Sequence, residues 1–280
     1  RAANRMLFGV DAVPVHDFSN ADVVITFGAD FMETWVSPVD YSRGFTQAHA
    51  YRNGERGYLI SVTPHQMLTD LNADEWLAIR PGTEHLVALA MARAIVEAGR
   101  GQAGTAASIL NGIDIAQVAE ASGVSEERIR AAALRFANNG RSLAVGPGVQ
   151  STHRAATAVA AAVAILNSVA GNVGRTVRFD RVEEHASGAS FSAMQALLTR
   201  MRNGEVGALL IHGPNPLYSV PLGEDAAAAL QNVPFIASFA TNLDETSRYA
   251  HLLLPDHHFL ESWGDYTPRT GIHSLVQPVM

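Results

Sequence analysis

The 280-residue chain contains no cysteine and no lysine. The absence of cysteine excludes disulfides, thiolate nucleophiles and cysteine-ligated zinc or iron–sulfur clusters within this stretch. The absence of lysine excludes Schiff-base chemistry and the phosphate-binding lysine of P-loop enzymes. Charged residues are scarce, at 17%, and the formal net charge is −7. This acidic balance argues against nucleic acid as a partner, because a nucleic-acid binder normally carries a basic face.

The hydrophobic fraction of 48% is too high for a disordered chain and is typical of a globular α/β protein. The most apolar run, residues 155–170, is shorter than the ~20 residues that cross a bilayer, so we interpret it as a buried helix. The chain starts at Arg1 and stops at Met280 inside sequence with the pattern of ordered structure. We therefore expect it to be a piece of a longer polypeptide.

Short β-rich runs alternate with helical patterns along the chain. Strands are predicted at residues 21–27, 58–62, 76–80, 142–146, 207–212, 235–238 and 251–254. A helix is predicted to begin near Thr83 and to end near Ala98, and residues 171–190 are predicted to be irregular. Alternating strands and helices predict parallel sheets with right-handed crossovers. We therefore predict an α/β fold of two Rossmann-like parallel-sheet units with helices on both faces, formed by residues 1–140 and 141–280.

Several predicted strands end in loops where ligands could bind. In open α/β sheets, ligands sit beyond the carboxyl ends of the strands. The corresponding loops are residues 28–30, 63–65, 146–148, 213–216 and 240–242. A glycine after a strand usually serves only a turn, and the chain has no G-x-G-x-x-G dinucleotide motif. The loops are therefore candidate sites without a ligand that the pattern itself identifies.

Histidines and acids gather near the end of the chain without forming a recognisable catalytic or metal-binding pattern. His251, His257, His258 and His273 have acidic residues between them, but their spacing matches no metal-site motif. The adjacent acids at residues 244–245 are better explained as charges at a helix N-terminus. No G-x-S-x-G nucleophile motif is present. The residues themselves thus predict no metal site and no catalytic residue.

Five segments follow one another in an order found in a known family. They are ADVVITFGAD at residues 21–30, ADEWLAIRPGTE at 73–84, LNSVAGNVGR at 166–175, GPNP at 213–216 and ETSRYAHLLLP at 245–255. Together they resemble the molybdopterin oxidoreductase family, which includes dimethyl sulfoxide reductase, formate dehydrogenase and polysulfide reductase. The resemblance covers nearly the whole chain. It implies that the two units are the middle α/β domains of such a protein.

The resemblance also implies which residues would line the cofactor site, in a functional or a vestigial form. Active members hold molybdenum between two pterin guanine dinucleotides, in loops like those described above. The positions in this chain that match the cofactor-binding ones are Gly28, Asp30, Thr63, His65, Gly82, Thr83, His153, Gly213, Asn215 and Asn242.

Several of these positions depart from the family pattern. The aspartate that typically accepts hydrogen bonds from guanine is replaced by Thr63 in the first unit and by Ala240 in the second. His65 replaces a basic neighbour of that aspartate, and Asp30 replaces an asparagine near a pyrophosphate. A lost charge-assisted hydrogen bond costs roughly 1.5–3 kcal/mol. The resemblance therefore implies weak dinucleotide binding, unless neighbouring residues replace the lost groups.

One subgroup combines the family fold with a degenerate cofactor pocket. The segments LPDHHFLESWGD at residues 254–265 and SLVQP at 274–278 resemble the molybdopterin-like iron–sulfur subunit of bacterial alternative complex III. That resemblance implies a non-catalytic scaffold without a cofactor, in a membrane complex that oxidises quinol. Iron–sulfur clusters would lie elsewhere in the full subunit. The partners would be cytochrome c and quinol-binding membrane subunits, on the outer, periplasmic face of the membrane.

Two other interpretations remain open. The chain could be a section of a catalytic reductase of the polysulfide or thiosulfate class, with molybdenum held by two pterin guanine dinucleotides. It could also be a free-standing α/β binding domain unrelated to either class. Stoichiometric molybdenum in the intact protein would favour the catalytic interpretation, and a folded monomer of residues 1–280 would favour the free-standing one.

Overall fold

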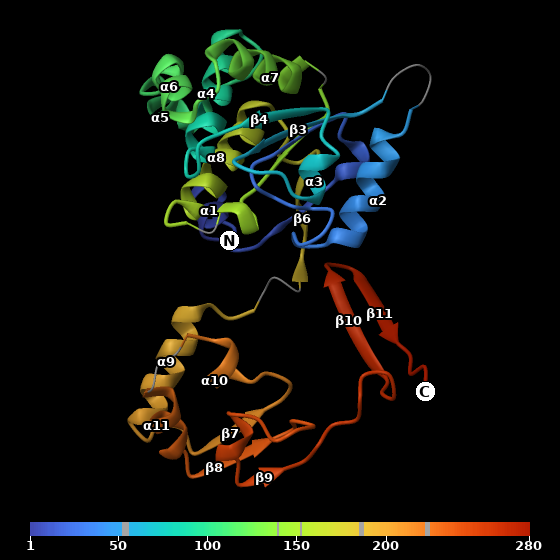
Figure 1. Cartoon of the computed structure of the whole chain (residues 1–280), viewed down its shortest axis with the longest axis vertical. Coiled ribbons are helices and arrows are strands. Elements are labelled where there is room, and N and C mark those ends of the chain that lie inside the picture. Colours follow the sequence, from blue (N-terminus) through green and yellow to red (C-terminus); the bar gives the residue numbers. More distant parts are fainter. Residues whose placement is uncertain (52–55, 139, 152, 185–187, 222–224) are drawn as a thin grey trace. The chain divides into compact units, whose positions relative to one another are not determined.

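The computed structural model describes residues 1–51, 56–138, 140–151, 153–184, 188–221 and 225–280 (Figure 1). The chain forms two compact units. The first contains residues 1–186 and 269–271, and the second contains residues 187–268 and 272–280. Each unit holds a parallel sheet with helices packed against it, so the predicted α/β class is confirmed.

The first unit is built on a four-stranded parallel sheet. Its strands are β2 (Val23–Thr26), β3 (Tyr58–Thr63), β4 (Glu75–Ala78) and β5 (Ser142–Val145), in the order β4-β3-β2-β5. Because β5 pairs in parallel with β2, the strand at 142–145 belongs to the first sheet. The predicted division near residue 140 therefore does not match the compact units, which divide near residue 186. Hydrophobic periodicity identifies a strand but does not say which sheet it joins.

The helices of the first unit cover both faces of this sheet. Successive residues of a strand point to opposite faces, so Val23 and Ile25 contact a cluster formed with α4, α7 and α8, whereas Val24 joins a cluster formed with α2. The helices are α1 (Ala2–Phe8), α2 (Pro38–His49), α3 (Leu68–Leu71), α4 (Glu84–Glu97), α5 (Ala107–Asn111), α6 (Ile115–Ser122), α7 (Glu126–Asn138) and α8 (Ala156–Val169). Short 3-10 turns are η1 (Phe18–Asn20), η2 (Gly104–Ala106) and η3 (Val149–Ser151).

A small antiparallel pair completes the first unit. β1 (Pro14–His16) pairs with β6 (Val177–Val182), which lies in the stretch predicted to be irregular. That prediction is wrong because charged residues separate the apolar ones in β6, which is also partly exposed, so it carries no hydrophobic run. Helix α4 begins and ends where the sequence predicts, with Thr83 at its N-cap and Ala98 at its C-cap.

The second unit has a three-stranded parallel sheet, β7 (Ala208–Ile211), β8 (Phe235–Ser238) and β9 (Leu252–Leu253). Its helical elements are α9 (Phe191–Arg202), α10 (Pro216–Ser219), α11 (Asp225–Gln231) and η5 (Ser247–Tyr249). Ile211, Ile236 and Leu230 join the sheet and α11 in one core. Strands β10 (Gly264–Arg269) and β11 (Ile272–Val276) form a hairpin. In the described parts of the chain, we find no helix with the length and hydropathy that a membrane crossing requires.

Candidate functional site

The order of the strands places a candidate crevice between β2 and β5. The chain passes outward from β2 through β3 to β4, and then returns to add β5 on the other side of β2. Ligands of open α/β sheets bind at such a switch, beyond the carboxyl ends of the two diverging strands. Here those ends carry the loop of residues 27–31 and the loop of residues 146–151. The sequence predicted both loops as candidate sites.

The two loops pack directly against each other. Gly28 has a φ of 71°, and a Cβ atom added to it would lie 2.6 Å from Oγ of Ser151. A Cβ atom on Gly148 would overlap the carbonyl oxygen of Gly28 and would lie 2.8 Å from Cα of Ala29. Glycine at 28 and 148 therefore allows backbone to meet backbone across the switch. The space between the carboxyl ends of β2 and β5 is filled by the loops themselves.

Asp30 is buried beside this contact, with 1% of its surface exposed. Its Oδ1 accepts hydrogen bonds from the backbone N–H of Thr69 at 3.1 Å and from Oγ1 of Thr69 at 2.6 Å. Its Oδ2 has no hydrogen-bond partner among the described residues. The carboxylate is therefore held by the first turn of α3, within the fold of the first unit.

Thr63 and its neighbours form a buried polar cluster at the end of β3. The hydroxyl of Thr63 lies 3.0 Å from Oγ of Ser61 and accepts a hydrogen bond from Nε1 of Trp76 at 3.1 Å. Ser61 also donates to Oδ1 of Asp70 at 2.7 Å, and Gln150 donates to Oδ2 of Asp70 at 2.7 Å. Asp70 thus ties the loop after β5 to β3. By contrast, His65 lies on the exposed surface, so the structure does not join it to this cluster.

Contacts within the loop itself hold the segment before α4 in place. Gly82 adopts a φ of 85°, which favours glycine. The hydroxyl of Thr83 donates to the carbonyl oxygen of Arg80 at 2.6 Å. Thr83 stands at the N-cap position, as predicted, but its side chain does not accept a hydrogen bond from the helix.

His153 is held by the first residue of α4. Its Nε2 lies 3.2 Å from Oε2 of Glu84, whose side chain is fully buried, and its Nδ1 accepts a hydrogen bond from the backbone N–H of Ala155 at 3.1 Å. The second bond places the ring proton on Nε2, so Nε2 donates to Glu84 and both ring nitrogens are engaged. Burial lowers the pKa of the neighbouring His85. Sequence reasoning missed this pairing, because 69 residues separate its members.

In the second unit, Asn215 connects the loop after β7 to the segment before η5. Its Nδ2 donates to Oε2 of Glu245 at 2.7 Å, and its Oδ1 accepts from Oγ1 of Thr246 at 2.6 Å. The bond from Asn215 lowers the pKa of the Glu245 carboxyl. Gly213, with a φ of 86°, and Asn242 are both exposed. The structure therefore engages Asn215 within the fold and leaves Gly213 and Asn242 on the surface.

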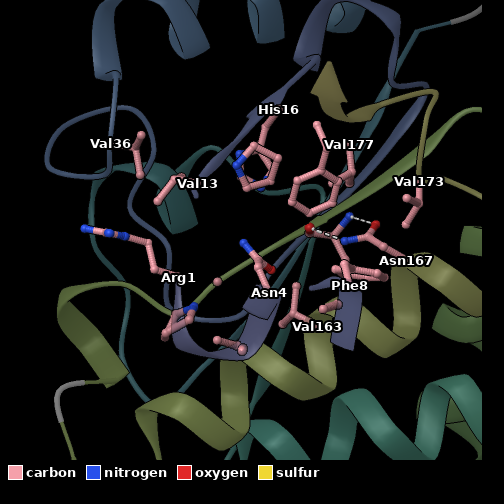
Figure 2. Close-up of a pocket in the computed structure, with 18 of the residues that line it drawn as sticks. Arg1, Asn4, Phe8, Val13, His16, Val36, Val163, Asn167, Val173 and Val177 are labelled. Atoms are coloured by element: carbon pink, nitrogen blue, oxygen red, sulfur yellow. Dashed lines mark hydrogen bonds between the residues drawn. The ribbon is translucent and has the colours of Figure 1, made fainter. Parts of the chain in front are cut away.

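A separate pocket of about 250 Å³ lies between α1, β1 and α8 in the first unit (Figure 2). His16, Phe8, Val163 and Asn167 line it, and apolar side chains dominate. The ring of His16 also lies 5.0 Å from the ring of Trp35, measured between centroids. Burial lowers the pKa of His16 from 6.5 to about 4. His16 is therefore neutral in the folded protein at ordinary pH.

The low pKa of His16 predicts a loss of stability in mild acid. Between pH 6.5 and about 4 the unfolded chain protonates this ring and the folded chain does not, so the free energy of unfolding is expected to fall by up to about 3 kcal/mol as pH decreases. His16→Gln should flatten this slope in urea unfolding measured across the window. His65→Gln, at an exposed position, is the control for losing a histidine. Equal slopes for wild type and His16→Gln would contradict the prediction.

Within the described ranges, no group of three or more histidine, cysteine or acidic side chains is arranged to hold a metal ion. His212 and Asp256 pair at 2.6 Å, without a third such neighbour. The histidines of the C-terminal stretch therefore form no metal centre in this part of the chain.

Comparison with known proteins identifies one family. The family model described as "Molybdopterin oxidoreductase" matches residues 6–280. The "Menaquinone reductase, molybdopterin-binding-like subunit" of Nitratidesulfovibrio vulgaris is 27% identical over 98% of this chain and 42% of its own length. The "Assimilatory nitrate reductase catalytic subunit" of Bacillus subtilis is 24% identical over 96% of this chain and 44% of its own length.

A solved structure shares the fold. Acetylene hydratase from Pelobacter acetylenicus matches with a TM-score of 0.73 and 18% identity, covering 99% of this chain and 46% of that chain. At this identity the likeness concerns the fold alone. The chain spans less than half the length of these relatives.

Proposed function

We propose that this chain, which belongs to the molybdopterin oxidoreductase family, is the cofactor-less scaffold portion of a subunit in a membrane-bound quinol:acceptor oxidoreductase of the alternative complex III type. The observation that carries the proposal is the contact between the loops after β2 and β5. Gly28 and Gly148 bring these loops together where an open α/β sheet would otherwise receive a ligand. A dinucleotide there would have to separate two backbones that are in contact.

The side chains at the positions that match the cofactor-binding residues of the family also fit a pterin guanine dinucleotide poorly. Thr63 offers a hydroxyl already engaged with Ser61 and Trp76, where a carboxylate would have to accept two guanine N–H groups. Ala240 offers no polar side-chain atom in the second unit. Asp30 would place a buried negative charge close to a pyrophosphate. In this proposal, no reaction step involves this cofactor.

His153 supports the same proposal. Its two ring nitrogens are bound to Glu84 and to the backbone of residue 155, so neither is available to a phosphate or a pterin. Glu84 adds a fully buried carboxylate at the start of α4, where a helix N-terminus would otherwise favour an anion. In this proposal, the polar residues of the family site now hold the loops of the scaffold together.

The relative from Nitratidesulfovibrio vulgaris, a molybdopterin-binding-like subunit of a menaquinone reductase, supports the proposed setting. We infer that the chain packs against cytochrome c and quinol-binding membrane subunits on the outer face of a bacterial membrane. Iron–sulfur clusters elsewhere in the full subunit would carry the electrons. The scaffold would contribute shape and contact surface and would supply no catalytic residue.

A catalytic function is the second candidate, because nitrate reductases are also among the relatives. In that case, the chain would be a section of a molybdenum reductase, such as one of the polysulfide or thiosulfate class. The residues that would then line the two dinucleotides are Gly28, Asp30, Thr63, Gly82, His153, Gly213, Asn215 and Asn242.

Metal and nucleotide analysis of the purified native complex separates the two candidates. We expect neither stoichiometric molybdenum nor guanine nucleotide released on denaturation, because the crevice is filled and the guanine-accepting carboxylates are missing. A nitrate reductase purified in the same way is the positive control. Two guanines for each molybdenum would overturn the scaffold proposal. Quinol oxidation without molybdenum would exclude the catalytic one.

A further inference from the structure

The apolar pocket between α1, β1 and α8 is large enough for a small ligand. Its volume of about 250 Å³ exceeds the roughly 150 Å³ of a cavity that binds benzene and lies below the ~300 Å³ at which pockets for drug-sized ligands begin. The pocket therefore has space for a molecule of one or two rings. All the residues that line it belong to the first unit, so its shape does not depend on the second unit.

Aromatic rings form part of the wall of this pocket. The ring of Phe8 lies 5.2 Å from the ring of Phe179, measured between centroids. The rings of His16 and Trp35 form a second pair in the wall, 5.0 Å apart. Small aliphatic side chains, such as Ala160 of α8, form much of the remainder. Because aromatic rings pack favourably on one another in tilted and offset arrangements, this wall favours a flat aromatic ligand.

Several polar side chains of the pocket are already engaged with the protein. Asn167 uses both ends of its amide to bind the backbone of β5. Nε1 of Trp35 donates to the carbonyl oxygen of Pro147 at 2.7 Å. Arg1, the charged residue of the lining in the described chain, pairs with Asp11. A charged ligand is therefore disfavoured, because it would lose water without gaining an opposite charge that is not already paired.

Two polar atoms of the wall lack a partner among the described residues, and both are hydrogen-bond acceptors. Nδ2 of Asn4 donates to the carbonyl oxygen of Ala12 at 2.9 Å, which leaves Oδ1 of Asn4 available. Nδ1 of His16 lies 3.5 Å from the phenol oxygen of Tyr41, whose own proton is donated to Glu183 at 2.8 Å. The neutral ring of His16 therefore carries its proton on Nδ1, and Nε2 offers a lone pair.

We propose that this pocket binds a small aromatic alcohol, a molecule of one or two rings that carries a hydroxyl group. The rings would pack among Phe8, Trp35 and Phe179, and the hydroxyl would donate to Nε2 of His16. Figure 2 shows the imidazole of His16 projecting into the pocket, on the side of Phe8 and Asn4. This inference is independent of the proposed function, since no residue matched to the cofactor site of the family lines the pocket.

Equilibrium dialysis of the full-length protein tests the site with two probes. 2-Naphthol has the hydroxyl donor, and 2-methoxynaphthalene has the same rings without it. We expect 2-naphthol to bind the wild type. His16→Phe keeps an aromatic ring and removes the acceptor, so it should weaken the binding of 2-naphthol about tenfold and leave that of 2-methoxynaphthalene nearly unchanged. His65→Phe, at an exposed position, is the matched control and should bind both probes as the wild type does.

Ala160→Leu tests whether the probes enter this pocket. Ala160 lines the pocket from α8, so a leucine side chain there should occupy part of the space and weaken the binding of both probes at least tenfold. Ala158→Leu is the matched control, because residue 158 lies on the same helix, is exposed and does not line the pocket. Circular dichroism confirms that each variant is folded.

Three outcomes would overturn the proposal. The first is a wild-type protein that does not bind 2-naphthol. The second is wild-type affinity for 2-naphthol in both His16→Phe and Ala160→Leu, which would place the probe elsewhere. The third is an equal loss of both probes in a folded His16→Phe variant, which would show that the hydroxyl does not bind the imidazole.

Discussion

Replacing Asn167 with leucine is expected to destabilise the first unit by roughly 2–6 kcal/mol, since two buried backbone groups would each lose a partner. Asn167 lies on α8 beside β5, the edge strand of the sheet. Its Oδ1 accepts a hydrogen bond from the N–H of Ala144 at 3.0 Å, and its Nδ2 donates to the carbonyl oxygen of Ala144 at 2.8 Å. The amide thus occupies the position that a neighbouring strand would take.

The expected loss is measurable by urea unfolding at constant pH. Leucine has the same number of side-chain heavy atoms and the same branching as asparagine but no donor or acceptor, so the change removes the hydrogen bonds and approximately keeps the shape. Asn72→Ala is the matched control, because Asn72 is exposed and donates one bond to Leu68. A loss below about 1 kcal/mol for Asn167→Leu would show that water replaces the amide at the edge of β5.

Replacing Gly148 with alanine is expected to cost about 3 kcal/mol or more, because the added methyl group has no space. It would overlap the carbonyl oxygen of Gly28 and approach Cα of Ala29, and both obstacles are backbone atoms that cannot rotate away. The loops after β2 and β5 would have to separate.

Gly112→Ala is the control variant for Gly148→Ala. Gly112 has a φ of −83°, and the nearest atom to an added Cβ is the carbonyl oxygen of Ile109 at 3.5 Å, an ordinary contact. The control should therefore be neutral or slightly stabilising in the same unfolding experiment. Equal stability of the two variants would mean that the contact between the loops is looser than the structure indicates.

Much of the fold could be predicted from local signals. Apolar runs located the strands of the first sheet, and Thr83 with Glu84 located the start of α4. The boundary between units could not be located in this way, because the pairing of β5 with β2 joins residues more than a hundred positions apart. β6 was not predicted for a different reason: charged residues separate its apolar ones, and the strand forms by pairing with β1, which lies far away in the sequence.

The candidate site could likewise be predicted only in part from the sequence. Loop positions such as Gly28 and Asp30 follow from the ends of strands, which sequence patterns reveal. The partners of those residues do not follow, since Thr69 binds Asp30 and Glu84 binds His153 only after the chain has folded. Gln150 and Ser151 carried no sequence signal at all. Their contacts with Asp70 and with the loop at Gly28 form only in the folded chain.

The asparagines of the LNSVAGNVGR segment have a consequence for how genomes are interpreted. Asn167 binds the edge of β5, and Asn172 binds both Asn167 and Ser142. These bonds stabilise a strand of the sheet, and none of them requires a metal. Under the scaffold proposal, a survey that counts molybdenum enzymes by such segments would also count this chain. Residues aligned with Thr63 and Ala240 are better suited to separate the two groups.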